Sequence, residues 1–399
     1  MSDINIGTAE PPGNKGSLGA SPSALAGEPR ILDRMAAELE RAGLVGEARA
    51  AKLVYLVLTS RLLHRPLCAA IKGQSSAGKS YLLDRVMALF PANAYHFMTS
   101  MSPKALAYGT KPLVHRILVI AEAAGFRKGD DALLLRSLIS EGHIHHETVE
   151  SSQVGLNSRV IEREGPTGLL VTTTSQQLEE ELETRMFSIP INDSPAQTTA
   201  ILAARASYWD GNGNVVPLDP APWHELQTWL ESGERRVVIP YAAEITARIP
   251  PAAVRLRRDV DTLWALVASH ALLHQAQRER DPKGQIIATL DDYAAVHELV
   301  ADLLSEGVGA SVKPEVRQTV EAVRALAKSG VSLDAIAKQL ELDKTTVSRR
   351  VKDAGSYLRN METRSGMVAC IVIGDPLPDE LEILPRPEQL TGDRCSVAA

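Results

Sequence analysis

A glycine-rich segment that ends in a lysine and a serine carries the strongest chemical signal in the sequence. The two glycines of such a segment permit backbone conformations in which the loop N–H groups cradle phosphate oxygens at a helix N-terminus. Lys79 would neutralise the β and γ phosphates of ATP, and the Ser80 hydroxyl would ligate Mg²⁺. A P-loop that binds a nucleoside triphosphate is therefore predicted. The pattern G-x-x-x-x-G-K-[ST] is matched in full by Gly73, Gln74, Ser75, Ser76, Ala77, Gly78, Lys79 and Ser80.

A glutamate that follows a later apolar segment is the candidate catalytic base. The apolar run 117–120 leads into Ala121 and Glu122. An additional strand is expected at 95–98. In P-loop proteins that have such a strand, the strand that corresponds to 117–120 usually ends with Asp-Glu. The Asp holds the magnesium water shell, and the Glu activates the attacking water. Glu122 occupies the position of the base, but Ala121 replaces the Asp. With Ala121 in place of the Asp, either magnesium affinity is weaker or Glu122 both holds the magnesium water shell and activates the attacking water. The alternative is that Glu122 has no catalytic role and only ends a buried strand.

Polar and basic residues elsewhere in the chain complete the expected hydrolytic site. The segment 169–171 ends in threonines, and the hydroxyl of Thr173 or Thr174 could contact the γ-phosphate and the water. Arg185 precedes the last predicted strand and, in a ring of subunits, could reach the γ-phosphate of a neighbour; the alternative is an exposed, salt-bridged arginine. One of Arg257 or Arg258, at the start of a long helix, could contact the nucleotide within the same subunit.

The fold class follows from the alternation of short apolar segments with helical ones. Strands are expected near 67–72, 95–98, 116–121, 168–174 and 187–191, and helices follow Lys79 and cover 132–140. This alternation predicts a parallel α/β sheet of the P-loop NTPase type. Two extended arms at 143–149 and 159–164 predict an inserted β-hairpin. Its histidines, His143, His145 and His146, lack a completing carboxylate or cysteine, so a metal site is not expected there.

The C-terminal part has the pattern of a helix-turn-helix. Segment 332–340 has helical spacing with Ser332 as N-cap, and a second helix begins after a short turn. Val347 would pack inward, while arginines and short polar groups face outward, as a DNA recognition helix requires. Segments 355–359 and 368–373 would form the strands of a wing. The alternative is a helix pair that packs without DNA. The candidate DNA-binding residues are Lys344, Thr345, Thr346, Ser348, Arg349 and Arg350.

Composition limits the classes of protein to which the chain can belong. Its 399 residues allow two or three domains, and a net charge of −6 excludes a uniformly basic coat, so that any DNA contact needs a local basic surface. Three scattered cysteines predict no disulfide framework and a cytoplasmic location, and neither a membrane helix nor a signal peptide is expected. The predicted domains are a disordered tail (1–29), an N-terminal helical segment (30–65), the P-loop ATPase core (66–220), a helical lid region (221–312), a winged helix-turn-helix (313–374) and a loose, acidic, Pro-rich tail (375–399).

Several segments together resemble AAA+ ATPases of the minichromosome-maintenance-like and superfamily 3-like type, which occur in bacterial and mobile-element replication proteins. The resemblance covers roughly residues 31–385. It implies a ring-forming motor, such as a hexamer, whose hairpin at 143–164 faces a central channel and places Arg159, Arg163 and the histidines near DNA. It also implies a role for each candidate residue of the hydrolytic site. The base would be Glu122, sensor 1 would be Thr173 or Thr174, the arginine finger would be Arg185, and sensor 2 would be Arg257 or Arg258. The segments are GQSSAGKSYLL, LVIAEAAGF, LLRSLISEGHIHHETVE, EREGPTGLLVTTT, LETRMFSIPI, IPPAAVRLRRD and LDKTTVSRRV.

The function expected from these features is that of a DNA-dependent ATPase, acting as a ring-forming helicase or as a replication initiator, with ATP and Mg²⁺ as cofactors. DNA and further copies of the same chain are the expected partners. Two alternatives remain open. One is an ATP-gated DNA-binding regulator without motor activity, which Ala121 favours. The other is an ATPase that remodels a protein partner through its helix-turn-helix.

Overall fold

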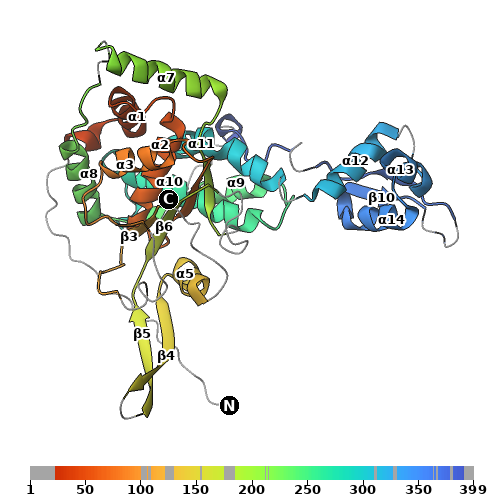
Figure 1. Cartoon of the computed structure of the whole chain (residues 1–399), viewed down its shortest axis with the longest axis horizontal. Coiled ribbons are helices and arrows are strands. Elements are labelled where there is room, and N and C mark those ends of the chain that lie inside the picture. Colours follow the sequence, from red (N-terminus) through yellow and green to blue (C-terminus); the bar gives the residue numbers. More distant parts are fainter. Residues whose placement is uncertain are drawn as a thin grey trace.

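A parallel sheet lies at the centre of the larger part of the chain (Figure 1). Its strands are β1 (Cys68–Lys72), β2 (Tyr95–Met98), β3 (Arg116–Ile120), β6 (Thr167–Thr173) and β7 (Phe187–Pro190). Within the described residues they form one five-stranded sheet in the order β2-β3-β6-β1-β7. The α/β class and these five strands are confirmed. The computed structural model describes residues 23–99, 106, 109–121, 130–152, 155–174, 185–211, 213, 215–309, 312–326, 330–362, 364, 367–377 and 381–390.

Alternation along the strands divides the interior into two layers. Ala69 and Ile71 of β1 face the larger core, which contains α1 (Ile31–Arg41), α2 (Ala48–Thr59) and α3 (Lys79–Met87). Cys68 and Ala70 face a smaller core beneath α5 (Asp130–Glu141). Successive side chains of a strand point to opposite faces, so a parallel sheet with apolar residues on both faces needs cover on both. The short apolar runs of the sequence therefore specify a three-layer arrangement.

The N-terminal region joins the larger core earlier than predicted. Leu25 and Ala26 are buried in a short 3₁₀ helix, η1 (Ala24–Gly27). Ser23 caps this helix by accepting a hydrogen bond from the N–H of Leu25. The prediction of disorder for residues 1–29 is therefore wrong for Ala24–Gly27, because the buried side chains of Leu25 and Ala26 anchor this turn. Residues 1–22 lie outside the described part of the chain.

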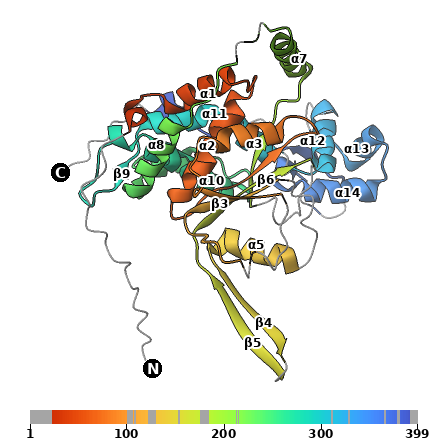
Figure 2. The same ribbon diagram turned by 60° about the vertical axis from the view of Figure 1, so that its left-hand side comes forward.

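The predicted hairpin is present and longer than expected. It consists of β4 (Ile144–Ser152) and β5 (Gly155–Arg163), which pair antiparallel from Ile144–Arg163 to Ser152–Gly155. Ile144 and Ile161 anchor its base in the smaller core. Its far end extends away from the sheet in both views (Figures 1 and 2). The hairpin thus has a fixed base and a projecting tip.

The region after the sheet is mainly helical but contains a short strand pair. β8 (Val237–Val238) runs parallel to β9 (Ile286–Ile287), which the prediction of an all-helical region missed. The long helix begins at Leu256, after two prolines at 250–251 that the interior of a helix would not accommodate. Helix α7 stands apart, with Gln197 as its one buried residue. The helices are α7 (Pro195–Trp209), α8 (Ala221–Ser232), α9 (Ala242–Arg248), α10 (Leu256–Leu273) and α11 (Leu290–Gly309).

The C-terminal unit has a core of its own. Helices α12 (Pro314–Leu326), α13 (Leu333–Leu340) and α14 (Lys344–Asp353) are followed by the antiparallel strands β10 (Leu358–Asn360) and β11 (Ile371–Ile373). Val320, Ile336 and Val347 are among the buried residues of this core. As predicted, Ser332 caps α13 by accepting a hydrogen bond from the N–H of Ala335. Three helices and a two-stranded ribbon therefore fold around apolar residues at helical spacing.

The chain then returns from this unit to the larger core. Ile383, Leu384 and Leu390 are buried there, and η7 (Pro387–Leu390) contacts α11. The hydroxyl of Tyr293 donates a buried hydrogen bond of 2.6 Å to the carbonyl of Pro385. The prediction of a loose tail from 375 is wrong for residues 381–390, because these three large apolar residues sit among the prolines and charges. We call residues 381–390 the C-terminal strap.

Candidate functional site

The segment 73–80 forms the turn between β1 and α3, as its sequence predicts. Gly78 has a φ of 93° at the N-cap of α3, a conformation that side chains with a Cβ rarely adopt. A Cβ atom on Gly73 would lie 3.3 Å from the Cβ of Ile191, so the loop approaches the end of β7 closely. Ile191 also donates its N–H to the Lys72 carbonyl at 3.0 Å. The two glycines thus allow the chain to turn within a restricted space.

Lys79 is held directly over this loop. It is the first residue of α3, its side chain is buried, and Nζ donates hydrogen bonds to the carbonyls of Gly73 (2.9 Å) and Gln74 (2.6 Å). The N–H groups in the first turn of a helix have no intrahelical acceptor, and that end of the helix carries partial positive charge. An ammonium group and backbone donors therefore occupy one place, and together they can bind an oxyanion. Ser80 follows as an exposed hydroxyl.

The ends of the neighbouring strands lie at the same edge of the sheet. Lys72 of β1 is the register partner of Thr173 of β6, and Thr174 follows as an exposed residue. On the other side of β6, Ala121 follows β3 and donates its N–H to the carbonyl of Met98 at 2.9 Å. The loop, the predicted threonines and residue 121 are therefore brought to one edge. The predicted base, Glu122, lies outside the described residues.

The structure places the predicted arginines at two separate points. Arg185 donates a hydrogen bond to the Ser140 hydroxyl at the end of α5. Arg257 and Arg258 are exposed in the first turn of α10. Arg255 instead forms an ion pair of 2.9 Å with Asp259 one turn later. The roles of Arg185, Arg257 and Arg258 toward a nucleotide stay predictions.

One residue of the hairpin has a structural use that the sequence did not reveal. The guanidinium of Arg163 donates hydrogen bonds to the carbonyls of Leu106, Gly109 and Lys111, which fixes the base of the hairpin to the preceding segment. Burial lowers the pKa of Arg163. These donors are used within the chain, and the expectation that Arg163 lies near DNA stays a prediction. His145 is exposed and donates to Glu162 at 3.2 Å.

The second helix of the C-terminal pair, α14, displays basic residues while some of its polar groups are already used. Thr346 donates both its N–H and its hydroxyl to Asp343, which caps the helix. Lys344 forms an exposed ion pair of 2.8 Å with Asp334. Thr345 and Arg349 are exposed, and Ser348 and Arg350 are half-buried. Arg349 and Thr345 are thus the best-placed predicted residues for contact with a partner.

A cavity of about 410 Å³ lies beside the loop and was not predicted. We call it the Glu47 cavity. Its polar wall includes Glu47, the N-cap of α2, and Asn192, which follows β7. The N–H of Asn192 donates a hydrogen bond to Glu47 Oε1 at 3.2 Å. Ile191 both lines the cavity and faces Gly73. No local sequence pattern joins two segments 145 positions apart, so only the fold could show this site.

Burial changes the acid–base behaviour of this carboxyl group. Glu47 is 8% exposed, and burial raises its pKa to about 7, against the opposing effect of the Asn192 hydrogen bond. Its neighbour Arg49 is directed elsewhere and donates to Asp302 of α11 at 2.7 Å. Within the described part of the chain, no cation forms an ion pair with Glu47. The cavity therefore contains a carboxyl group that exchanges its proton near neutral pH.

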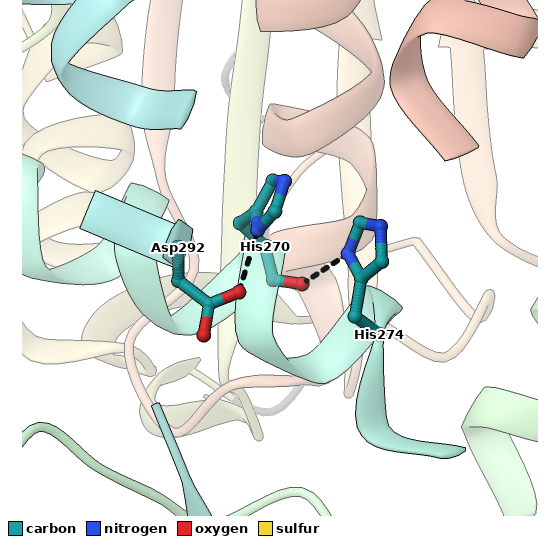
Figure 3. Close-up of side chains that lie close together, drawn as sticks. All are labelled: His270, His274 and Asp292. Carbon is teal, nitrogen blue, oxygen red and sulfur yellow. Dashed lines mark hydrogen bonds and ion pairs between the residues drawn. The ribbon is translucent and has the colours of Figure 1, made fainter. Parts of the chain in front are cut away.

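A second titratable cluster lies between α10 and α11 (Figure 3). Asp292 accepts hydrogen bonds from His270 Nδ1 (2.7 Å), Arg278 Nη2 (2.6 Å) and the N–H of Thr289 (2.8 Å). His274 Nδ1 donates to the His270 carbonyl at 3.0 Å. Burial raises the pKa of Asp292, but these hydrogen bonds outweigh it and hold the pKa below its usual range. Asp292 is already paired with an imidazole and a guanidinium, so the cluster fits an ion-pair network that joins two helices rather than a metal centre. Among the described residues, His274 Nε2 is buried without a hydrogen-bond partner.

Comparison with known proteins adds no assignment to these features. Among the helices that the structure describes, none has both the length and the apolar composition needed to cross a lipid bilayer. No protein-family model matches the chain, and no curated protein matches its sequence.

Proposed function

We propose that the chain binds a nucleoside triphosphate, with the phosphates on the loop 73–80 and the base in the Glu47 cavity, and that it hydrolyses this nucleotide while acting on DNA. The observation that carries the proposal is the position of Lys79 over the loop. Its ammonium nitrogen lies 2.9 Å from the carbonyl oxygen of Gly73 and 2.6 Å from that of Gln74, at the start of a helix. A phosphate oxygen is a better acceptor for this cation than a loop carbonyl, because the hydrogen bond then joins two charged groups.

The chemistry assigned to this chain's residues is the activation of water. Glu122 takes the proton of a water molecule whose oxygen bonds to the γ-phosphorus, while the bond from that phosphorus to the bridging oxygen of the diphosphate breaks. Thr173 or Thr174 orients the water from the end of β6. Ser80 would hold Mg²⁺, which supplies charge neutralisation at the phosphates. Arg185 of a neighbouring subunit would stabilise the transferred phosphoryl group in a ring.

Two exposed features support DNA as the partner. The hairpin β4–β5 projects from the sheet. Its tip can therefore contact a DNA strand that does not touch the rest of the core. Helix α14 exposes Arg349 and Thr345 in a unit with three helices and a two-stranded ribbon, the composition of a winged helix. Contacts from such residues to phosphates would tether the motor to duplex DNA.

The binding test uses the full chain with ATP and Mg²⁺. Saturable binding is expected for the native protein, and Lys79→Ala is expected to weaken it on the order of a hundredfold, because it removes a charge-assisted hydrogen bond to phosphate. Arg85→Ala serves as the control, since it removes the same charge from the far end of α3. Equal affinity in the native protein and Lys79→Ala would remove the proposal.

Motor activity requires a second measurement. The ATP hydrolysis rate is compared with and without single- and double-stranded DNA, and the oligomeric mass is determined in each condition. A rate that rises with DNA in a multimer supports the motor. A rate that DNA leaves unchanged contradicts it.

The second candidate is an ATP-gated DNA-binding regulator, and Ala121 is the observation that favours it. The residue follows β3 at the edge where a magnesium-binding Asp is expected, and alanine supplies no oxygen ligand. Ala121→Asp distinguishes the two candidates. Under the regulator hypothesis the native chain has negligible turnover, and this substitution raises it.

A further inference from the structure

The Glu47 cavity contains a carboxyl group whose environment requires an explanation. Buried carboxylates are ordinarily paired with a cation, because loss of hydration strongly disfavours an isolated charge. Arg49, two residues away, is engaged by Asp302 and by the Leu299 carbonyl at 2.9 Å. Asp193 adds a second carboxylate to the cavity wall. Around Glu47, therefore, the described charged groups leave its own charge uncompensated.

Only one oxygen of Glu47 has a partner among the described residues. Oε1 accepts the N–H of Asn192, and no described group forms a hydrogen bond with Oε2. The carboxyl lines the cavity together with the apolar residues Ala50, Leu53 and Leu303 and the polar residues Arg49, Asn192, Asp193 and Ser194. A wall that combines apolar side chains with polar groups is suited to a flat heterocycle, which the apolar side chains cover and the polar groups orient. Ile191 separates this space from the phosphate loop by a single side chain.

We propose that Glu47 reads the nucleobase and that its proton decides whether adenine is accepted in addition to guanine. This inference rests on the proposed function, because the base must be held by a triphosphate on the loop 73–80. It goes beyond that function by assigning the choice of nucleotide to one ionisable group.

The assignment follows from the hydrogen-bonding patterns of the two forms of the acid. A protonated carboxyl presents a donor O–H beside an acceptor oxygen. That pair matches the Watson–Crick edge of adenine, which offers the N1 acceptor beside the N6 amino donor. It also matches the O6 acceptor beside N1–H of guanine, so the acid form accepts either base. An ionised carboxylate presents two acceptors and matches guanine, which offers N1–H beside the N2 amino group. The Asn192 N–H occupies one lone pair of Oε1 and leaves the other available in either form.

Both forms are populated near neutral pH. Burial raises the pKa of Glu47 to about 7, so the acid predominates below that pH and the carboxylate above it. Both bases are then accepted at the lower pH, and guanine alone is matched at the higher pH. Binding is also linked to protons: ATP binding favours uptake of a proton by Glu47, and GTP binding does not require it.

The test measures the dissociation constants of ATP and GTP with Mg²⁺ on the full chain, from about pH 6 to about pH 8, on either side of the Glu47 pKa. The ratio of the two constants is used, because protonation of the triphosphate is common to both nucleotides and cancels. The preference for ATP over GTP is expected to fall on the order of tenfold across this range, the value of about one hydrogen bond to a charged group. Calorimetry in two buffers should show more proton uptake with ATP than with GTP.

Glu47→Gln is the decisive variant. Its amide keeps a donor beside an acceptor but has no titratable proton, so the ratio of the ATP and GTP dissociation constants should stay near its value at the lower pH and become independent of pH. Glu40→Gln is the matched control, since it removes an exposed glutamate of α1 outside the cavity and should retain the pH dependence of the native chain.

The outcomes separate this inference from the proposed function. If the native chain binds both nucleotides with a ratio that does not change with pH, or if Glu47→Gln keeps the pH dependence, the inference is overturned and triphosphate binding stands. If the native chain binds neither nucleotide, both fall.

Discussion

Lys72 at the end of β1 lies directly opposite Thr173 at the end of β6. Because β6 separates β1 from β3, whatever follows β3 approaches the phosphate loop across one intervening strand. In a sheet, neighbouring strands are about 4.8 Å apart, so residue 121 begins roughly two spacings from the loop. That separation leaves room for a terminal phosphate and a water molecule between the lysine and a carboxylate that follows β3.

Glu122→Gln tests the predicted base. The substitution keeps the size of the side chain but removes its ability to accept a proton, so turnover should fall by roughly 10² to 10⁴ while ATP affinity is retained. Steady-state hydrolysis and equilibrium binding of ATP check the two parts. Glu141→Gln, an exposed glutamate at the end of α5, should leave both unchanged. Full turnover in Glu122→Gln would show that another group activates water.

Arg349→Ala combined with Arg350→Ala tests the DNA surface of α14. Removal of two phosphate contacts should weaken duplex binding and reduce the slope of log affinity against log salt by about 2. Titrations at several salt concentrations measure both effects. Lys338→Ala on α13 is the control of equal charge type. Unchanged affinity and slope in the double variant would assign the surface to another partner.

His274 should make the stability of the chain depend on pH. Burial lowers its pKa to about 4, so the folded chain keeps it neutral where the unfolded chain binds a proton, below about pH 6.5. The stability from this group is present above about pH 6.5 and is lost as the pH falls toward 4. The free energy of unfolding should drop by about 2 kcal/mol between about pH 7 and about pH 5.

Urea denaturation at the two pH values measures this loss. His274→Gln should lack it, and His64→Gln, at an exposed histidine, should show it in full. A native-like pH dependence in His274→Gln would place the effect in another group.

The C-terminal strap should contribute measurably to stability. Ile383 is fully buried in the larger core, and its replacement by alanine should lower the free energy of unfolding by about 2 to 5 kcal/mol. Denaturation by urea provides the value. The adjacent Glu382→Ala breaks only an exposed ion pair with Arg386 and should change it by less than about 1 kcal/mol. Similar values for the two variants would mean that the strap does not pack as described.

Local patterns predicted most of the sheet and the loop, because each depends on neighbours in sequence. The strand of Val119 was predicted from its apolar neighbours, and the turn at Gly78 was predicted from its motif. The capping of α13 by Ser332 was also predicted, since the acceptor and the N–H are three residues apart. The predicted nucleotide and DNA roles of these regions stay predictions.

Features that depend on contacts between distant segments were missed. Glu47 became a candidate only when Asn192 was placed against it. Arg163 was expected at a DNA surface, and the carbonyls that bind it belong to residues more than fifty positions earlier. Ile383 is surrounded in sequence by charges and prolines, so its burial could not be inferred from its own segment. Tertiary packing, not local preference, decides all three.

The return of the chain through the strap means that the C-terminal unit is held at both of its ends. It enters after α11 and leaves by a segment that packs on the same helix. An appendage with one attachment can swing through a wide arc, whereas a unit with two attachments is limited largely to rotation about the line that joins them. Both attachments adjoin α11, so this one helix anchors the unit that carries Arg349 on α14.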